Sequence, residues 1–153
     1  MLPIERRDEP DEALRKQVDD GLSAHNARYS AAFAEEDADP AKKPRPLDLF
    51  VRDADGRVRA GLVGQLRFAW TGQGWLYISR LWVDESLRGQ DYGTRLLRQA
   101  EDAAREAGCT AVHLTTFSFQ ARPFYEKQGY RCVGTLEGYP PGGSYYWMLK
   151  QPL

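Results

Sequence analysis

The central part of the chain alternates between apolar and polar residues, as β-strands do. Two such runs lie between Leu47 and Trp70, on either side of the tetrapeptide Asp53–Gly56, whose Asp and Gly residues favour a hairpin turn. A third run, residues 75–83, follows a glycine-containing segment at 71–74. The pattern therefore predicts a meander of three antiparallel strands.

Apolar residues recur at helical spacing in three other segments. Residues 10–33 form the first, with acids in the first turn and a weak point at Gly21, so they predict either one helix or two. Residues 94–107 carry a stripe of leucine and alanine and end before Gly108, a typical helix C-cap. Residues 121–128 predict a short third helix. The apolar positions of the first segment are Leu14, Val18, Leu22 and Tyr29.

The remaining strands follow the second and third helices. Residues 109–117 are rich in β-forming residues, and 130–138 and 144–150 flank a turn at 139–143. The resulting order is helix, three strands, helix, strand, helix, two strands. Its central strand–helix–strand unit requires a right-handed crossover and one parallel pair, so we expect a mixed sheet in an α+β fold.

Length and composition indicate a single domain. We expect a charged N-terminal tail at 1–9 and one domain at 10–153. Within that domain, residues 35–46 combine acids, lysines and three prolines, and this composition predicts a mobile loop.

Charge and hydropathy narrow the choice of partners. The chain has 21 Lys and Arg against 22 Asp and Glu, a formal net charge of -1, so it lacks a general basic field that would bind nucleic acid. No apolar run approaches the ~18 residues that a membrane span needs, so we expect a cytoplasmic protein with no membrane partner. The two cysteines and two histidines lack ligand-like spacing, which predicts no metal site and no disulfide.

The segment Arg88–Gly93, with the sequence RGQDYG, joins the third predicted strand to the long helix. A helix N-terminus has unpaired N–H groups and about half a positive charge, so it attracts phosphate. Gly89 and Gly93 allow a ligand close to the backbone, and Arg88 offers paired donors to phosphate oxygens. A tight turn would use the same glycines, so this segment alone leaves both interpretations open.

Two segments together resemble the signature motifs of the GNAT superfamily of N-acetyltransferases, which use acyl-coenzyme A. They are VDESLRGQDYGTRLL at 83–97 and ARPFYEKQGY at 121–130. The resemblance covers roughly residues 76–149, and the predicted order of elements agrees with it. It implies a GNAT-like α+β fold: a mixed, mostly antiparallel sheet of six to seven strands, with a central parallel β-α-β unit flanked by helices.

The resemblance also implies a cosubstrate, acetyl-CoA, and the residues that hold it. The backbone of Leu81 and Val83 would bind the pantetheine arm, and the Gly-rich segment would bind the pyrophosphate. The residues of that segment are Arg88, Gly89, Gln90, Asp91, Tyr92, Gly93 and Thr94. Tyr125 would lie near the thioester sulfur and act as the general acid for the departing thiolate. The alternative is a tyrosine packed on the sheet with its hydroxyl at the surface.

Two residues depart from the family pattern. Asp91 stands where the family usually has its central glycine, and it either caps the helix with its side chain or repels the phosphates. Ser118 stands where many relatives carry an asparagine that contacts coenzyme A. A serine still forms hydrogen bonds but has a shorter reach.

The sequence does not single out the general base that deprotonates the attacking amine. The alternatives are a water held by Tyr77 or Ser79, and the carboxylates of Glu85 and Glu137. His113 falls within a predicted buried strand, where we expect a hydrogen-bonded core histidine.

Aromatic residues gather near the C-terminus. They line an acceptor pocket, or they fill the core and face a dimer partner; the sequence leaves both open. They are Tyr139, Tyr145, Tyr146 and Trp147. The resemblance alone implies a homodimer.

The sequence thus predicts an N-acetyltransferase. It would transfer an acetyl group from acetyl-CoA to a primary amine of a small molecule, a peptide N-terminus or a lysine, by direct attack on the thioester. The alternative is a catalytically silent acyl-CoA-binding or sensor protein of the same fold, in which Asp91 marks lost cofactor use. An unrelated nucleotide-binding α/β protein is disfavoured, because only one parallel strand follows the helix after Gly93.

Overall fold

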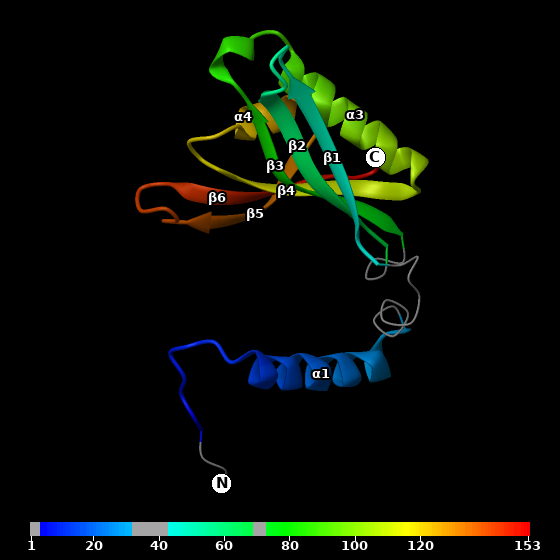
Figure 1. Ribbon diagram of the computed structural model, residues 1–153, viewed down its shortest axis with the longest axis vertical. Helices are drawn as coiled ribbons and strands as arrows, with labels where there is room; N and C mark the ends of the chain where they lie inside the picture. Colours follow the sequence, from blue (N-terminus) through cyan, green and yellow to red (C-terminus); the bar gives the residue numbers. More distant parts are fainter. Residues whose placement is uncertain (1–3, 32–42, 69–72) are drawn as a thin grey trace.

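The computed structural model describes residues 4–31, 43–68 and 73–153 (Figure 1). Six strands and three α-helices lie in these residues, in the predicted order. They are α1 (Glu12–Tyr29), β1 (Arg45–Arg52), β2 (Val58–Arg67), β3 (Gly74–Val83), α3 (Tyr92–Glu106), β4 (Cys109–Phe117), α4 (Arg122–Lys127), β5 (Arg131–Glu137) and β6 (Ser144–Lys150), with a short 3₁₀ helix, η2, at Glu85–Leu87. The predicted α+β class is confirmed.

The strands form one mixed sheet in the order β1-β2-β3-β4-β6-β5. Only β3 and β4 are parallel among these neighbours, and α3 is the crossover between them. The predicted meander is confirmed as β1, β2 and β3, and its first hairpin turns at Asp53–Gly56, where Asp53 N donates to Arg57 O at 3.0 Å.

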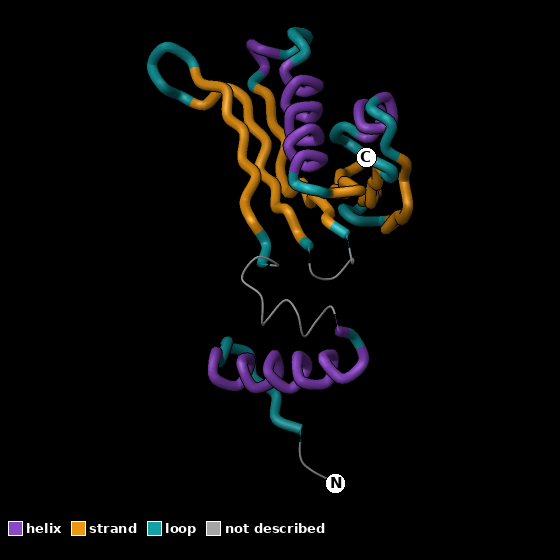
Figure 2. The backbone as a smooth tube through the Cα atoms, turned by 90° about the vertical axis from the view of Figure 1, so that its right-hand side faces the viewer, coloured by secondary structure: helices purple, strands orange, loops and turns teal. Residues whose placement is uncertain are grey.

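The core lies between the sheet and α3. Alternate residues of β2, β3 and β4 point to this side, as the two-residue period of a strand requires. Figure 2 shows α3 along one face of β1–β3, while the opposite face carries no helix of the described residues. The largest fully buried side chains are Leu62, Leu76, Leu97, Val112, Leu114 and Met148.

Helix α1 is continuous and lies apart from the sheet in both ribbon views. Asp11 caps it by accepting hydrogen bonds from Ala13 N and Leu14 N, both at 3.1 Å, and Gly21 does not divide it. The helix buries none of its residues. No helix of the described residues is long and apolar enough to cross a membrane.

The mobile loop that we predict at 35–46 needs one correction. Strand β1 already begins at Arg45, because Arg45 and Pro46 still pair with Leu66 and Gln65 of β2. Residues 35–42 of the predicted loop lie outside the described residues, so that part of the prediction stays untested.

Strands β3 and β4 part before either strand ends. Their pairing runs from Gly74 opposite Cys109 to Ile78 opposite Leu114. Beyond that pair β3 remains paired with β2 alone, and β4 with β6 alone. Figure 1 shows the two strands diverging from this point. The sheet therefore contains an opening with unpaired backbone groups on both sides.

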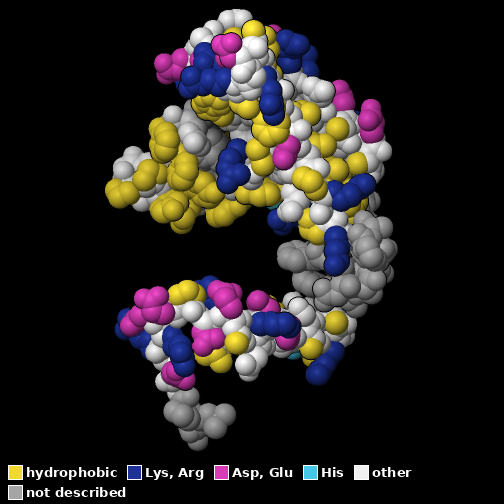
Figure 3. Space-filling view, viewed as in Figure 1, with side chains coloured by type: hydrophobic (Ala, Val, Ile, Leu, Met, Phe, Trp, Pro, Cys, Tyr) yellow, Lys and Arg dark blue, Asp and Glu magenta, His cyan; other side chains and the backbone are white. Residues whose placement is uncertain are grey.

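Exposed apolar residues gather on β5, β6 and the turn between them, at the edge of the sheet farthest from β1. Figure 3 shows hydrophobic side chains over β5 and β6, on the side turned toward α1. Those exposed by more than a third include Val133, Leu136, Tyr139 and Trp147.

Candidate active site

A pocket of about 260 Å³ lies at the N-terminus of α3, beside the end of β3. Most of the residues predicted to bind the pyrophosphate line it, together with Leu87 and Phe124, which the sequence analysis did not single out. Phe124 lies inside the second motif, next to Tyr125, and this position could have identified it from the sequence as a residue of the site. The lining residues are Val83, Leu87, Arg88, Gly89, Asp91, Tyr92, Gly93, Thr94 and Phe124.

A hydrogen-bonded turn fixes the segment between β3 and this pocket. Asp84 Oδ1 accepts hydrogen bonds from Ser86 Oγ at 2.6 Å, from Ser86 N at 3.0 Å and from Arg59 Nη2 at 2.9 Å. The bonds from Ser86, and after them the charge of Arg59, lower the pKa of Asp84 below its ordinary value. The turn thereby ties the end of β3 to β2 and directs the chain into the pocket.

The start of α3 supplies backbone donors to the pocket. Its first hydrogen bond runs from Arg95 N to Asp91 O, at 2.9 Å. The N–H groups of Tyr92, Gly93 and Thr94 therefore have no partner within the helix. Together with the helix dipole, they form a site suited to an anion.

Of the two alternatives that the sequence left open for Asp91, the structure does not show the first, in which its side chain caps the helix. It occupies the N-cap position but makes no side-chain capping hydrogen bond, and its backbone is left-handed with φ of 62°. Glycine adopts this conformation at little cost, which explains why the family usually has glycine here. Asp91 is one of the residues that line the pocket.

Arg88 and Gln90 hold the turn before α3. Arg88 Nη1 lies 3.2 Å from Glu85 Oε1, in an exposed ion pair that is weak and easily exchanged for another anion. Gln90 Nε2 donates to Ser86 O at 3.0 Å, and Gln90 does not line the pocket. Gly89, with φ of 74°, supplies the left-handed residue of this turn.

Tyr125 is 6% exposed and packs into the core from α4. Its ring meets those of Phe124 and Tyr130 edge to face, with centroids 5.2 and 5.7 Å away. Burial raises the pKa of Tyr125 to about 12, so its hydroxyl is protonated at neutral pH. The hydroxyl can therefore donate a hydrogen bond at neutral pH.

The other predicted cofactor residues lie outside the pocket at the start of α3. Leu81 is on β3 beyond Ile78, where β3 no longer pairs with β4. Ser118 lies at the end of β4, where its Oγ accepts from Ser144 N at 3.0 Å and its N donates to Ser144 O at 2.8 Å. Ser118 therefore secures the turn between β5 and β6.

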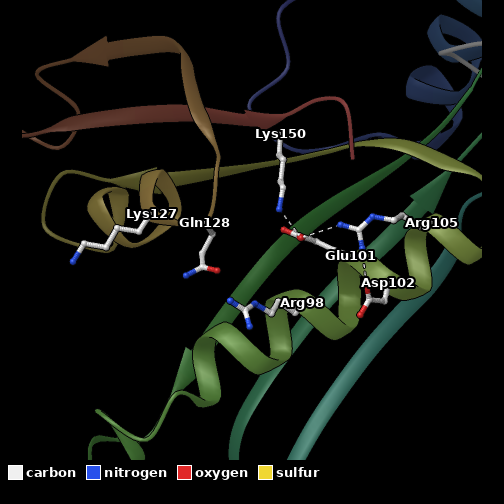
Figure 4. A pocket seen from close by; sticks show the side chains of 7 residues that line it. All are labelled: Arg98, Glu101, Asp102, Arg105, Lys127, Gln128 and Lys150. Carbon is white, nitrogen blue, oxygen red and sulfur yellow. Dashed lines mark hydrogen bonds and ion pairs between the residues drawn. The ribbon is translucent and has the colours of Figure 1, made fainter.

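A second hollow, of about 370 Å³, lies between α3, the C-terminal end of α4 and β6 (Figure 4). At its base Glu101, 3% exposed, accepts a hydrogen bond from Tyr130 and one from Lys150 Nζ at 2.7 Å. Burial and the neighbouring Glu101 raise the pKa of Tyr130. The sequence analysis missed this cluster, because the spacing of Glu101 and Arg105 is typical of a solvent-exposed pair.

Comparison with known proteins agrees with the fold. The model of the acetyltransferase (GNAT) family matches residues 10–130. Acetyltransferase Atu2258 of Agrobacterium fabrum is 35% identical over 94% of this chain and 95% of its own length. Blasticidin-S acetyltransferase of Streptomyces morookaense is 36% identical over 73% of this chain and 82% of its own length.

A solved structure extends the similarity to three dimensions. The crystal structure of an acetyltransferase from Bacillus cereus superimposes with a TM-score of 0.77 at 30% identity, over 96% of this chain and 97% of that chain. Its similarity covers the sheet and the helices on which the pocket stands. The chain therefore belongs to the GNAT family of acetyltransferases and is an acyltransferase.

Proposed function

We propose that the protein transfers an acetyl group from acetyl-CoA to a primary amine, by direct attack of the amine on the thioester. The acceptor is a small molecule, a peptide N-terminus or a lysine. The observation that carries the proposal is the pocket at the start of α3. Three backbone N–H groups without a partner within the helix begin α3 there, directly after the turn that contains the left-handed Gly89.

The described residues fit the diphosphate of this cosubstrate. The N–H groups of Tyr92, Gly93 and Thr94 would bind its oxygens, and Arg88 would exchange Glu85 for a phosphate. Beyond the pocket, the unpaired edge of β3 at Leu81 and Val83 offers backbone groups to the amides of the pantetheine arm, as a neighbouring strand would.

Tyr125 is the proposed general acid. Its hydroxyl remains protonated at neutral pH because burial disfavours the phenolate. It would donate a proton to the sulfur as the carbon–sulfur bond breaks, and solvent would then return a proton to the phenolate. The acetyl group supplies the electrophile, and the opening between β3 and β4 gives the amine access to it.

Two measurements test this proposal. Titration calorimetry with acetyl-CoA measures binding, and release of the free thiol measures transfer to each member of a panel of amines. The panel contains blasticidin S, because a relative is named for it, together with 2-phenylethylamine, a lysine-containing peptide and a peptide with a free N-terminus. Binding with transfer to any of these supports the proposal, whereas absence of binding refutes it.

One observation favours the alternative of a silent acyl-CoA-binding protein. Asp91 lines the pocket and makes no side-chain capping hydrogen bond, so its carboxylate would add negative charge near the phosphates. The two functions differ in the thiol assay, because a sensor binds acetyl-CoA and transfers nothing to any amine.

A homodimer is part of the same proposal. Its support is the exposed apolar surface of β5 and β6, which contains Val133, Leu136 and Trp147. Sedimentation equilibrium of the full chain distinguishes a dimer from a monomer. A cytoplasmic location likewise stays a prediction, which fractionation of the source cells would test.

A further inference from the structure

The opening in the sheet has a histidine beside it that the mechanism above leaves unused. Tyr77 on β3 pairs with His113 on β4, and the next pair, Ile78 with Leu114, is the last before the strands part. His113 therefore stands one pair away from the place where an amine would reach the thioester.

His113 and Tyr77 lie on the face of the sheet opposite α3. Their neighbours along each strand, Ile78 and Leu114 among them, point into the core, and side chains alternate along a strand. The rings of His113 and Tyr77 are stacked, with centroids 4.9 Å apart and planes at 28°. The indole of Trp75 meets His113 edge-on at 5.9 Å. The imidazole is thus held in one orientation by aromatic contacts.

Neither ring nitrogen of His113 is hydrogen-bonded in the described part of the chain, residues 4–31, 43–68 and 73–153. This differs from the hydrogen-bonded core histidine that we expected from the sequence: the side chain is half-buried and stacked on the ring of Tyr77. A half-buried imidazole with a free lone pair is able to accept a proton.

The surroundings keep His113 neutral. Burial lowers the pKa of His113, and the charge of Arg67 lowers it further. Arg67 comes from β2 and lies over the ring of Tyr77, with Cζ 5.4 Å from the centroid. The other facing groups are Trp75 and Tyr77 from β3 and Leu149 from β6, and none of these carries a charge at neutral pH.

We propose that His113 is the general base of acetyl transfer, and that the acceptor amine approaches from the sheet face opposite α3. The inference rests on the proposed function, because it assigns the proton acceptor which that reaction needs. It also replaces the alternatives that the sequence left open. These are a water held by Tyr77 or Ser79, and the carboxylates of Glu85 and Glu137, both of which lie on the exposed surface.

The protons balance in this scheme. The imidazole of His113 takes one proton from the ammonium form of the acceptor, and the freed nitrogen forms a bond to the thioester carbon. The carbon–sulfur bond then breaks, and Tyr125 supplies the proton that the sulfur gains. The nitrogen gives up its second proton as the amide forms. This second proton goes to solvent, and His113 also returns its proton to solvent. Solvent in turn reprotonates Tyr125, so each turnover releases one proton.

The test compares two nucleophiles on the full-length protein. 2-Phenylethylamine is protonated at neutral pH and needs a base, whereas hydroxylamine is already unprotonated and does not. For His113→Gln we expect kcat/KM for 2-phenylethylamine at pH 7 to fall on the order of 10²-fold, while the rate with hydroxylamine and the Kd for acetyl-CoA change less than about threefold. His25→Gln replaces the other histidine, on α1, as the matched control.

The pH profile separates a base from a structural role. With the unmodified protein, kcat/KM for 2-phenylethylamine should rise with pH through a pKa below 6.5 and then level off. With His113→Gln it should instead keep rising as free amine accumulates. A parallel profile at lower rate, or equal losses with both nucleophiles, overturns the inference. His113→Asn repeats the test if His113→Gln unfolds.

The two proposals fail differently. If the unmodified protein binds acetyl-CoA and acetylates 2-phenylethylamine or blasticidin S, but His113→Gln keeps the same rate and profile, only the assignment of His113 is wrong. If the unmodified protein acetylates no amine at any pH, the proposed function fails and the assignment fails with it.

Discussion

The hydroxyl of Tyr130 donates a hydrogen bond of 3.0 Å to Oε1 of Glu101, from the residue just before β5 to the middle of α3. Lys150 of β6 donates to Oε2 of the same carboxylate, at 2.7 Å. A single buried acid thus binds two strands at the far edge of the sheet to the helix whose N-terminus forms the anion pocket.

We expect Glu101→Gln to lower the free energy of unfolding by about 2 kcal/mol. An amide has one acceptor oxygen where the carboxylate has two, so either the buried hydroxyl of Tyr130 or the partly buried ammonium of Lys150 loses its partner. Urea unfolding followed by circular dichroism measures the change. Asp102→Asn is the control, because that side chain is 67% exposed and its pairing with Arg105 contributes less than about 0.5 kcal/mol. Equal midpoints for both variants would contradict the role of Glu101.

Asp91→Gly should stabilise the protein and improve acetyl-CoA binding together. The left-handed backbone at φ of 62° suits glycine, so we expect a gain of about 0.5 to 1 kcal/mol. Removing the carboxylate from the pocket wall should also lower Kd, by about threefold to tenfold. Thermal unfolding and calorimetry measure the two effects.

Asp91→Asn separates charge from conformation. It removes the negative charge but keeps a side chain in the left-handed conformation, so only the affinity should improve. If neither variant changes Kd, the carboxylate does not face the phosphates.

The local elements of the fold follow from the sequence. Alternation places the strands, the apolar stripe places α3, and the glycine-rich turn with a following helix places the anion pocket, because each depends on residues close together in the chain. The motif around Tyr125 likewise locates α4.

Other features depend on distant residues. Glu101 is buried by partners 29 and 49 residues further along the chain, so a single helix cannot reveal that it belongs to the core. The left-handed backbone of Asp91 is set by the turn that precedes α3. The free and stacked imidazole of His113 depends on where β3 and β4 part, which strand pairing alone decides.

Tyr125→Phe should lower turnover on the order of 10²-fold and leave the Kd for acetyl-CoA within about twofold. The phenyl ring keeps the contacts with Phe124 and Tyr130 and lacks only the proton donor. Because the pKa of Tyr125 is about 12, its acid form persists through about pH 10, so turnover of the unmodified protein should show no alkaline fall from this group below that pH. Thiol release from pH 6 to about 10 measures both effects.

Tyr29→Phe, on the exposed helix α1, is the control for loss of a tyrosine hydroxyl. Unchanged turnover in Tyr125→Phe would exclude this residue as the acid.

Asp84 should make the stability of the protein depend on pH in the acid range. Its pKa is lowered from 3.8 in the folded protein, so its contribution is complete above 3.8 and is lost as the pH falls through the lowered pKa. At pH 7 we expect Asp84→Asn to have a lower melting temperature than the unmodified protein. The difference in melting temperature should shrink steadily toward pH 3. Scanning calorimetry at both pH values measures it. A difference that is the same at pH 3 would mean that the charge of Asp84 does not stabilise the turn.

Gly93→Ala tests the pocket without disturbing the fold. A Cβ at this position would lie 3.6 Å from Cζ of Phe124 and 3.8 Å from Cγ2 of Val83, which are ordinary contacts, and the residue sits in the first turn of α3, where alanine is the better helix former. Stability should therefore stay the same or rise slightly. Phe124 and Val83 both line the pocket, however, so the added methyl group occupies space meant for the diphosphate, and we expect Kd for acetyl-CoA to rise about tenfold.

Gly89→Ala is the contrasting variant, because it should lower stability. Nothing lies within 4 Å of a Cβ at this position, but its φ of 74° strains any residue other than glycine, which lowers the free energy of unfolding by about 1 kcal/mol. Calorimetry measures the Kd for acetyl-CoA of both variants, and thermal unfolding measures their stability. If Gly93→Ala binds acetyl-CoA as tightly as the unmodified protein, the diphosphate does not occupy this pocket.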